Sequence, residues 1–116
     1  MHAADVAPEL EEWVAHTRER LRGTIVEAAA LATDAAASEG RLADAVRLAS
    51  RAEELAPDRD DVARRLVTSL WRAGRGGDAT RAYAAFAARL ARDYGANPAP
   101  ETRAHVESVG AVFAEG

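Results

Sequence analysis

Few side chains in this sequence could carry out chemistry, and none of them is spaced for it. The chain has no cysteine, which excludes a disulfide, a thiolate nucleophile and a thiolate metal site. Its histidines are His2, His16 and His105, and no two of them share a helical face with a carboxylate as in a zinc motif. We expect His16 and His105 to be surface residues and His2 to be disordered or tag-like. The sequence therefore predicts no catalytic, metal-binding or cofactor-binding residue.

The other candidate motifs are also better explained as structure. The glycine-rich stretch GRGG, residues 74–77, lacks the spacing and the following Lys-Ser/Thr of a phosphate-binding loop, so we interpret it as a turn. No serine occupies the strained turn that exposes a nucleophile, because all of them fall in predicted helices: Ser38, Ser50, Ser69 and Ser108. We expect a protein that is not an enzyme.

The charge balance bears on possible partners. All fifteen basic residues are arginines, against nineteen acidic residues, which gives a formal net charge of −4. Proteins that hold duplex DNA by its phosphates usually carry a basic patch. Arg18, Arg20 and Arg22 do cluster, but Glu19 and other acids share their helix, so we interpret the cluster as a solvated face. We expect no direct DNA binding by this chain alone.

Composition and length indicate one helical domain. Alanine supplies most of the 48% of hydrophobic residues, and it favours helix. A chain of 116 residues is one domain by size. Residues 1–20 contain acids and no apolar run, which argues against a signal peptide or a membrane span, so we expect a cytoplasmic location.

Hydrophobic periodicity predicts an all-α fold of about five to six antiparallel helices. No stretch alternates with a period of two, so no strand is expected. The predicted helices cover residues 8–40, with Pro8 at the first position and a bend near Gly23 as one alternative, then 42–56, 59–73, 78–94 and 100–113. We expect Asp58 to cap the third helix. The residues that recur at three- and four-residue steps along the first helix are Leu10, Trp13 or Val14, Thr17, Leu21, Ile25, Ala28, Ala32 and Ala35. We expect Trp13 to lie in the core.

Two helix pairs are related by an offset of 34 residues, the period of a tetratricopeptide (TPR) repeat. The equivalent pairs are Gly40 and Gly74, Asp44 and Asp78, Ala45 and Ala79, and Arg47 and Arg81. The second copy departs from the pattern, because Phe86 stands in the place of Ala52 and the proline equivalent to Pro57 is displaced to Pro98. The repeat predicts a TPR-like right-handed superhelical stack.

The stretch DYGANPAPET, residues 93–102, predicts an enlarged joint before the last helix. Gly95 suits the left-handed position after a helix, and Asn97 before Pro98 is held extended. Pro100 then restarts a helix whose apolar stripe is Val106, Val109 and Phe113. The joint therefore sets the angle at which this helix closes the stack.

In a TPR-like stack the first helix of each pair lines a concave face, and this is where we expect a partner to bind. Trp71 has two interpretations: a contact hot spot flanked by arginines, or an intramolecular cover over the first or the last helix. Ala63, Leu66, Val67 and Leu70 are expected in the core. The candidate partner-binding residues are Asp34, Asp61, Arg64, Thr68, Trp71 and Arg72, with Glu27 and Ala30 on the same face.

Three segments carry a resemblance to a known family. Residues 72–104, RAGRGGDATRAYAAFAARLARDYGANPAPETRA, resemble the end of the bacterial transcriptional activator domain of SARP-type regulators, and residues 8–22, PELEEWVAHTRERLR, are similar to its opening helix. The segment HAADVAPE, residues 2–9, looks like the family's lead-in. The resemblance implies one TPR-like domain over residues 8–114, preceded by a lead-in, residues 1–7, that need not be ordered.

That family's domain usually follows a winged-helix DNA-binding domain and serves self-association, contacts with the transcription machinery, or signal reception. The resemblance therefore implies a protein-interaction and oligomerisation module of a transcriptional regulator, either excised from a larger chain or free-standing. The alternative is a TPR-like adaptor that binds a peptide or protein and has no connection with DNA. One departure is Ala99, where relatives commonly have a serine before PET, so we expect the last helix to lack a cap and to fray.

Overall fold

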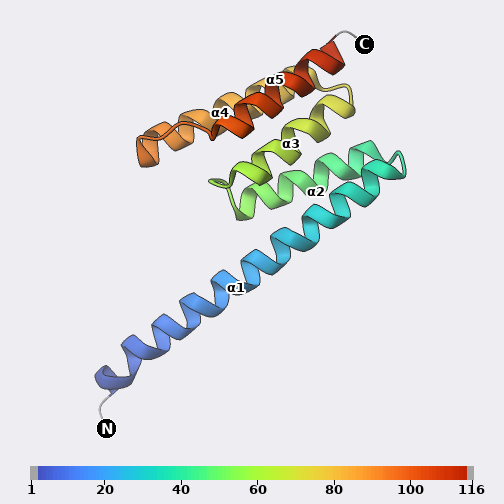
Figure 1. The fold of residues 1–116 in the computed structure, drawn as a ribbon. Coiled ribbons are helices and arrows are strands. Elements are labelled where there is room, and N and C mark those ends of the chain that lie inside the picture. Colours follow the sequence, from blue (N-terminus) through green and yellow to red (C-terminus); the bar gives the residue numbers. More distant parts are fainter. Residues whose placement is uncertain (1–2, 115–116) are drawn as a thin grey trace.

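The computed structural model describes residues 3–114, which form five helices and no strand (Figure 1). The predicted all-α fold is confirmed, and most helix boundaries lie within two residues of those predicted. The helices are α1 (Ala3–Ser38), α2 (Leu42–Leu55), α3 (Asp60–Arg72), α4 (Gly76–Tyr94) and α5 (Pro100–Ala114). No helix of this part of the chain is both long and apolar enough to cross a membrane.

The first helix is longer than predicted and has no break at Gly23. It begins at Ala3, five residues before the predicted start, so that Pro8 lies inside it. Pro8 is the sixth residue of the helix and lies past its first turn, so the helix lacks the backbone hydrogen bond that an N–H at this position would make. His2 lies outside the described residues.

The repeat of 34 residues is visible in the backbone. Gly40 and Gly74 both have φ 76°, in the left-handed region where glycine is not strained. At each glycine the next N–H donates to a carbonyl five residues earlier, over 2.8 Å in both cases: Arg41 to Ala36, and Arg75 to Leu70. α1–α2 and α3–α4 are therefore two copies of one helical hairpin, and in each copy the same glycine-dependent turn joins the two helices.

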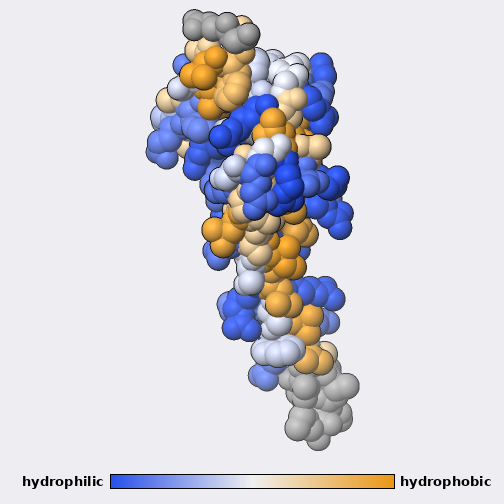
Figure 2. Space-filling view, turned by 90° about the vertical axis from the view of Figure 1, so that its right-hand side faces the viewer, coloured by the Kyte–Doolittle hydropathy of each residue, from blue (hydrophilic) through white to orange (hydrophobic). Residues whose placement is uncertain are grey.

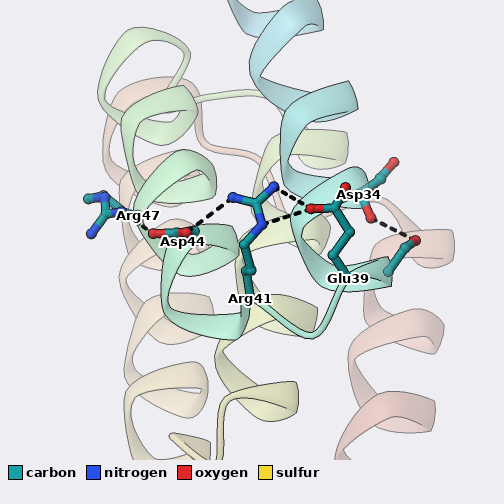
Figure 3. A network of polar contacts seen from close by, with 6 residues as sticks. Asp34, Glu39, Arg41, Asp44 and Arg47 are labelled. Carbon is teal, nitrogen blue, oxygen red and sulfur yellow. Dashed lines mark hydrogen bonds and ion pairs between the residues drawn. The ribbon is translucent and has the colours of Figure 1, made fainter.

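A cluster of ion pairs follows the first turn (Figure 3). Arg41 donates to Glu39 at 2.8 Å and to Asp44 at 3.1 Å, and Arg47 also donates to Asp44. The second hairpin repeats part of this cluster, with Asp78 accepting from Arg75 and Arg81. These exposed pairs each contribute little to stability, and their main effect is to fix the start of the second helix of each hairpin.

Small side chains let the helices approach closely. α1 packs on α2, α2 on α3, and α3 on both α4 and α5. Alanines at equivalent repeat positions, Ala45 and Ala79, are 1% and 0% exposed. α3 is the central helix and presents most of the core, with Val62, Ala63, Leu66, Val67 and Leu70 buried, which confirms the register predicted for it.

The periodic stripe of α1 does not face the core. Trp13, which was predicted to lie in the core, is 63% exposed, and Leu10, Leu21 and Ile25 are also more than half exposed. The buried residues of α1 are instead Val26, Thr33 and Ala36. Both sets repeat at helical spacing, and the set with smaller side chains is the one that packs on α2. The N-terminal part of α1 projects beyond α2 (Figure 1), so no other helix covers its stripe there.

The joint before α5 has the predicted backbone but a different capping scheme. Gly95 has φ 61° and ends α4, as expected. Asp58 does not cap α3, because that helix starts at Asp60 and the preceding Arg59 makes no capping bond with its side chain. The carboxylate of Asp58 instead accepts a hydrogen bond from the Tyr94 hydroxyl. Asp58 therefore ties the α2–α3 turn to the end of α4.

The start of α5 is tied to α3 by hydrogen bonds that the sequence of α5 does not indicate. Asp60 of α3 accepts a hydrogen bond from the Ala99 N–H at 2.9 Å and another from the Thr102 hydroxyl at 2.7 Å. A serine at position 99 would instead accept from the N–H groups of the first turn of α5. These bonds therefore do not replace that cap, but they hold the first turn of α5 against α3.

Candidate protein-interaction groove

A polar groove of about 260 Å³ runs between the first helices of the stack. α3 forms its floor, α1 one wall and α5 the other. Five of the six residues predicted on the concave face line it, namely Asp34, Asp61, Arg64, Thr68 and Arg72. The α3 members recur at steps of three and four residues, which places them on one side of the helix, opposite the residues that α3 buries.

The acidic residues of the groove are each paired with an arginine. Asp34 of α1 accepts two hydrogen bonds from Arg65 of α3, at 3.1 and 3.3 Å. Asp61 accepts two from Arg59, at 3.0 and 2.7 Å. The hydrogen bond from Arg59 holds the pKa of Asp61 below its usual value, and the same contact raises the pKa of Arg59. Neither carboxylate is therefore left without a positive partner.

The α5 side of the groove is held by a chain of hydrogen bonds. Arg64 donates to the Thr102 hydroxyl at 2.8 Å, and that hydroxyl donates to Asp60. Thr102 is fully buried. Nearby, the Thr68 hydroxyl donates to the carbonyl of Arg64 and lies 2.8 Å from Nε2 of His105. These contacts fix α5 to α3 and give the groove a rigid wall.

Five residues that line the groove were not among those predicted, namely Thr33, Ala37, Arg65, Ser69 and His105. Arg65 was not assigned to the concave face, although its position next to Arg64 on α3 would have allowed it. His105 was assigned to the surface, and it is exposed, but its place at the groove depends on how α5 docks on α3. No pattern within residues 100–113 indicates that docking.

Arg72 is a groove arginine whose side chain has no hydrogen-bond or ion-pair partner among the described residues. Its side chain is exposed, and within residues 3–114 it takes part in no hydrogen bond or ion pair. It lines the same groove as Arg64, Thr68 and His105. The groove therefore offers a guanidinium that an acidic group of a ligand could reach.

Trp71 lies outside the groove. It is half-buried and packs on the core formed by α2, α3 and α4. Its ring is next to Gly76 at the start of α4 and next to Gly110 of α5. Of the two interpretations of Trp71, the structure supports the intramolecular one, in which the indole covers the junction of α3 with α4 and α5.

The described residues contain no group of three or more histidine and acidic side chains that could hold a metal ion.

Comparison with known proteins gives one match. The family model of the bacterial transcriptional activator domain matches residues 2–109, which is most of the chain. No curated protein and no solved structure matches it.

Proposed function

Because the chain belongs to the bacterial transcriptional activator domain family, we propose that it is the non-catalytic protein-interaction module of a transcriptional regulator, and that its partner binds in the groove between α1, α3 and α5. Transcription takes place in the cytoplasm of bacteria, so we place the protein there. Family membership favours this function over an adaptor unrelated to transcription.

The observation that carries the proposal is the state of the groove's charges. Asp34 and Asp61 are neutralised by Arg65 and Arg59, whereas Arg72 is exposed and has no partner among the described residues. A bound segment with a carboxylate could form a charge-assisted hydrogen bond with Arg72, of the stronger kind. The preferred ligand is therefore an acidic segment of a protein.

The proposal includes contact with the transcription machinery, so the first probe is bacterial RNA polymerase holoenzyme. Its binding to the purified chain is measured by biolayer interferometry, for the native chain and for Arg72→Glu. We expect Arg72→Glu to weaken binding by about tenfold or more, equivalent to about 1.4 kcal/mol. The matched control is Arg103→Glu, which makes the same charge change on the exposed side of α5, outside the groove.

Equal weakening by the two substitutions would indicate a general charge effect and would contradict the groove as the binding site. Absence of binding by the native chain would show that polymerase is not the partner. In that case the same pair of variants is applied to partners that are cross-linked to the chain in cells.

We also propose that the chain alone does not bind duplex DNA. Its net charge of −4 opposes the phosphate backbone. A mobility-shift assay with random-sequence duplex at low salt tests this, because low salt favours any electrostatic binding.

A further inference from the structure

The projecting part of α1 carries an apolar stripe with the spacing of a coiled coil. Leu10, Val14, Thr17, Leu21 and Thr24 follow one another at alternating steps of four and three residues, the heptad pattern that forms the seam between two paired helices. Leu10 and Leu21 are 56% and 57% exposed. Figure 2 shows apolar side chains running along this projecting part between hydrophilic ones. Within the described chain this seam has no partner helix.

The seam faces away from the rest of the molecule. Among the side chains of α1 that the structure describes, from residue 7 onward, Val26 is the first to be buried against α2. Leu21 precedes it by five residues, which puts the two side chains about 140° apart around the helix axis. A helix could therefore lie along the seam without meeting α2.

We propose that the occupant of this seam is a second copy of the chain, with the two α1 helices antiparallel. In an antiparallel coiled coil, each seam residue of one helix faces a seam residue of the other helix that runs in the opposite direction. Because a two-fold axis relates the two copies, the two residue numbers in every facing pair have the same sum. Leu10 therefore faces Leu21 of the second copy, and Val14 faces Thr17. Both leucines of each helix are then covered in one register.

The charges beside the seam are self-complementary in this direction. Three glutamates stand at the N-terminal end of the segment, Glu9, Glu11 and Glu12, and three arginines further along, Arg18, Arg20 and Arg22. Antiparallel pairing brings the acidic end of each helix beside the basic part of the other, whereas parallel pairing would set like charges together. Opposite charges at positions flanking the seam set partner choice and direction.

Two flanking pairs are specific to the register. Glu11 lies next to the seam. In this register it is beside Arg18 of the second copy, which lies next to the seam on the other helix. On the other flank Trp13 meets Arg20 of the second copy, so a guanidinium can lie on the indole face. Glu19 points outward in this arrangement and keeps its pair with Arg22 of its own helix, at 2.9 Å.

The inference adds a self-association surface to the proposed interaction module, and it is tested on the isolated chain. The groove lies on α1, α3 and α5 farther along the chain, between residues 33 and 105. A failed dimerisation test therefore leaves the groove untouched, and a failed polymerase test leaves the seam untouched.

The first test is sedimentation equilibrium of the 116-residue chain. We expect the mass to rise with concentration from 12.3 kDa toward twice that value, and Leu21→Asp to raise the dimer dissociation constant by about tenfold or more. The matched control is Ala15→Asp, which adds the same charge at an exposed position of the same helix that lies off the seam. A native chain that stays monomeric at every concentration, or equal effects of the two substitutions, would overturn the proposal.

A charge exchange tests the direction of pairing. Glu11→Arg and Arg18→Glu should each weaken self-association, because each sets like charges against one another twice per dimer. A mixture of the two variants should recover dimers, since both flanking pairs are opposite in charge again. A loss of fold could not be recovered by mixing. Failure of the mixture to associate would exclude the antiparallel register.

Disulfide trapping gives the register directly, because the native chain has no cysteine. A mixture of Leu10→Cys and Leu21→Cys should form a cross-linked dimer of the two variants on mild oxidation. Efficient cross-linking of Leu10→Cys with itself would instead show parallel helices and contradict the proposal.

Discussion

The indole of Trp71 occupies space that Gly76 leaves open by having no side chain. A Cβ atom at position 76 would lie 2.5 Å from one ring carbon of Trp71 and 2.9 Å from another. On the opposite side of the ring system, a Cβ at Gly110 would be at an ordinary contact distance, 3.7 Å. α3, α4 and α5 therefore meet around one aromatic ring, and this contact requires glycine at the first position of α4.

Gly76→Ala should destabilise the protein by about 1–3 kcal/mol, the cost of forcing an extra carbon into a packed site. Urea denaturation measures this free energy of unfolding. The control is Gly77→Ala, where the nearest atom is a nitrogen of the flexible Arg81 side chain at 3.6 Å. That change should be neutral or stabilising by about 0.5–1 kcal/mol, because alanine favours helix. A Gly76→Ala variant as stable as the native chain would show that the ring moves freely.

Trp71→Ala should cost about 2–4 kcal/mol of stability, near the lower end of the range for large core residues because Trp71 is half-buried. Trp13→Ala is the control. Its side chain is 63% exposed, so its loss should change stability by about 0.5 kcal/mol or less in dilute, monomeric protein. In a Trp71→Ala background the cost of Gly76→Ala should disappear, which a double-mutant cycle detects. If Trp71→Ala left stability unchanged and abolished partner binding, Trp71 would be a contact residue instead.

The helices could be predicted from the sequence because their ends are set by local chemistry. Gly40, Gly74 and Gly95 end helices in the left-handed conformation, and Pro57 and Pro100 mark the adjacent stops and starts. Each of these preferences depends on one or two residues. The same locality allowed the 34-residue repeat and the core face of α3 to be recognised.

The predictions that were wrong concern which face of a helix is buried. α1 has two faces with helical periodicity, and only its packing on α2 decides that Val26 and Ala36 are buried while Trp13 is exposed. Trp71 was listed among the residues of the groove, but it packs on the core instead, because the space that Gly76 and Gly110 provide for it depends on three helices meeting. His105 joins the groove for the same reason. Such contacts are set by tertiary structure, which spacing along the chain does not encode.

The pKa of Asp61 in the groove is predicted to depend on Arg59. The hydrogen bond from Arg59 lowers this pKa below the ordinary value of 3.8, so the folded state binds a proton less readily than the unfolded chain. The contact therefore stabilises the fold above pH 3.8, and this contribution is lost as the pH falls through the lowered pKa. Arg59→Gln should raise the pKa of Asp61, measured from the carboxyl ¹³C shift in a pH titration.

Asp93 provides an internal control for that titration. Its pKa is also lowered, by the hydrogen bond from Arg92, and it lies on the surface of α4 at a distance from Arg59 in sequence and contacts. It should titrate identically in the native and Arg59→Gln proteins. A parallel shift of both residues would indicate a global change of fold and not the loss of one contact.

Asp60 is predicted to keep the first turn of α5 folded. Asp60→Ala would leave the Ala99 N–H and the buried Thr102 hydroxyl without their acceptor. An unsatisfied buried polar group costs about 1–3 kcal/mol. We expect a loss of this size, together with faster hydrogen exchange in the first turn of α5 and unchanged exchange in α2. Asp60→Asn keeps one carbonyl oxygen that can accept at the same place, so its effect should be smaller than that of alanine. If hydrogen exchange in α5 were unchanged in Asp60→Ala, the packing of α5 on α3 would be enough to hold the helix without the Asp60 hydrogen bonds. The side of the groove that Arg64 and α5 form would then not depend on Asp60.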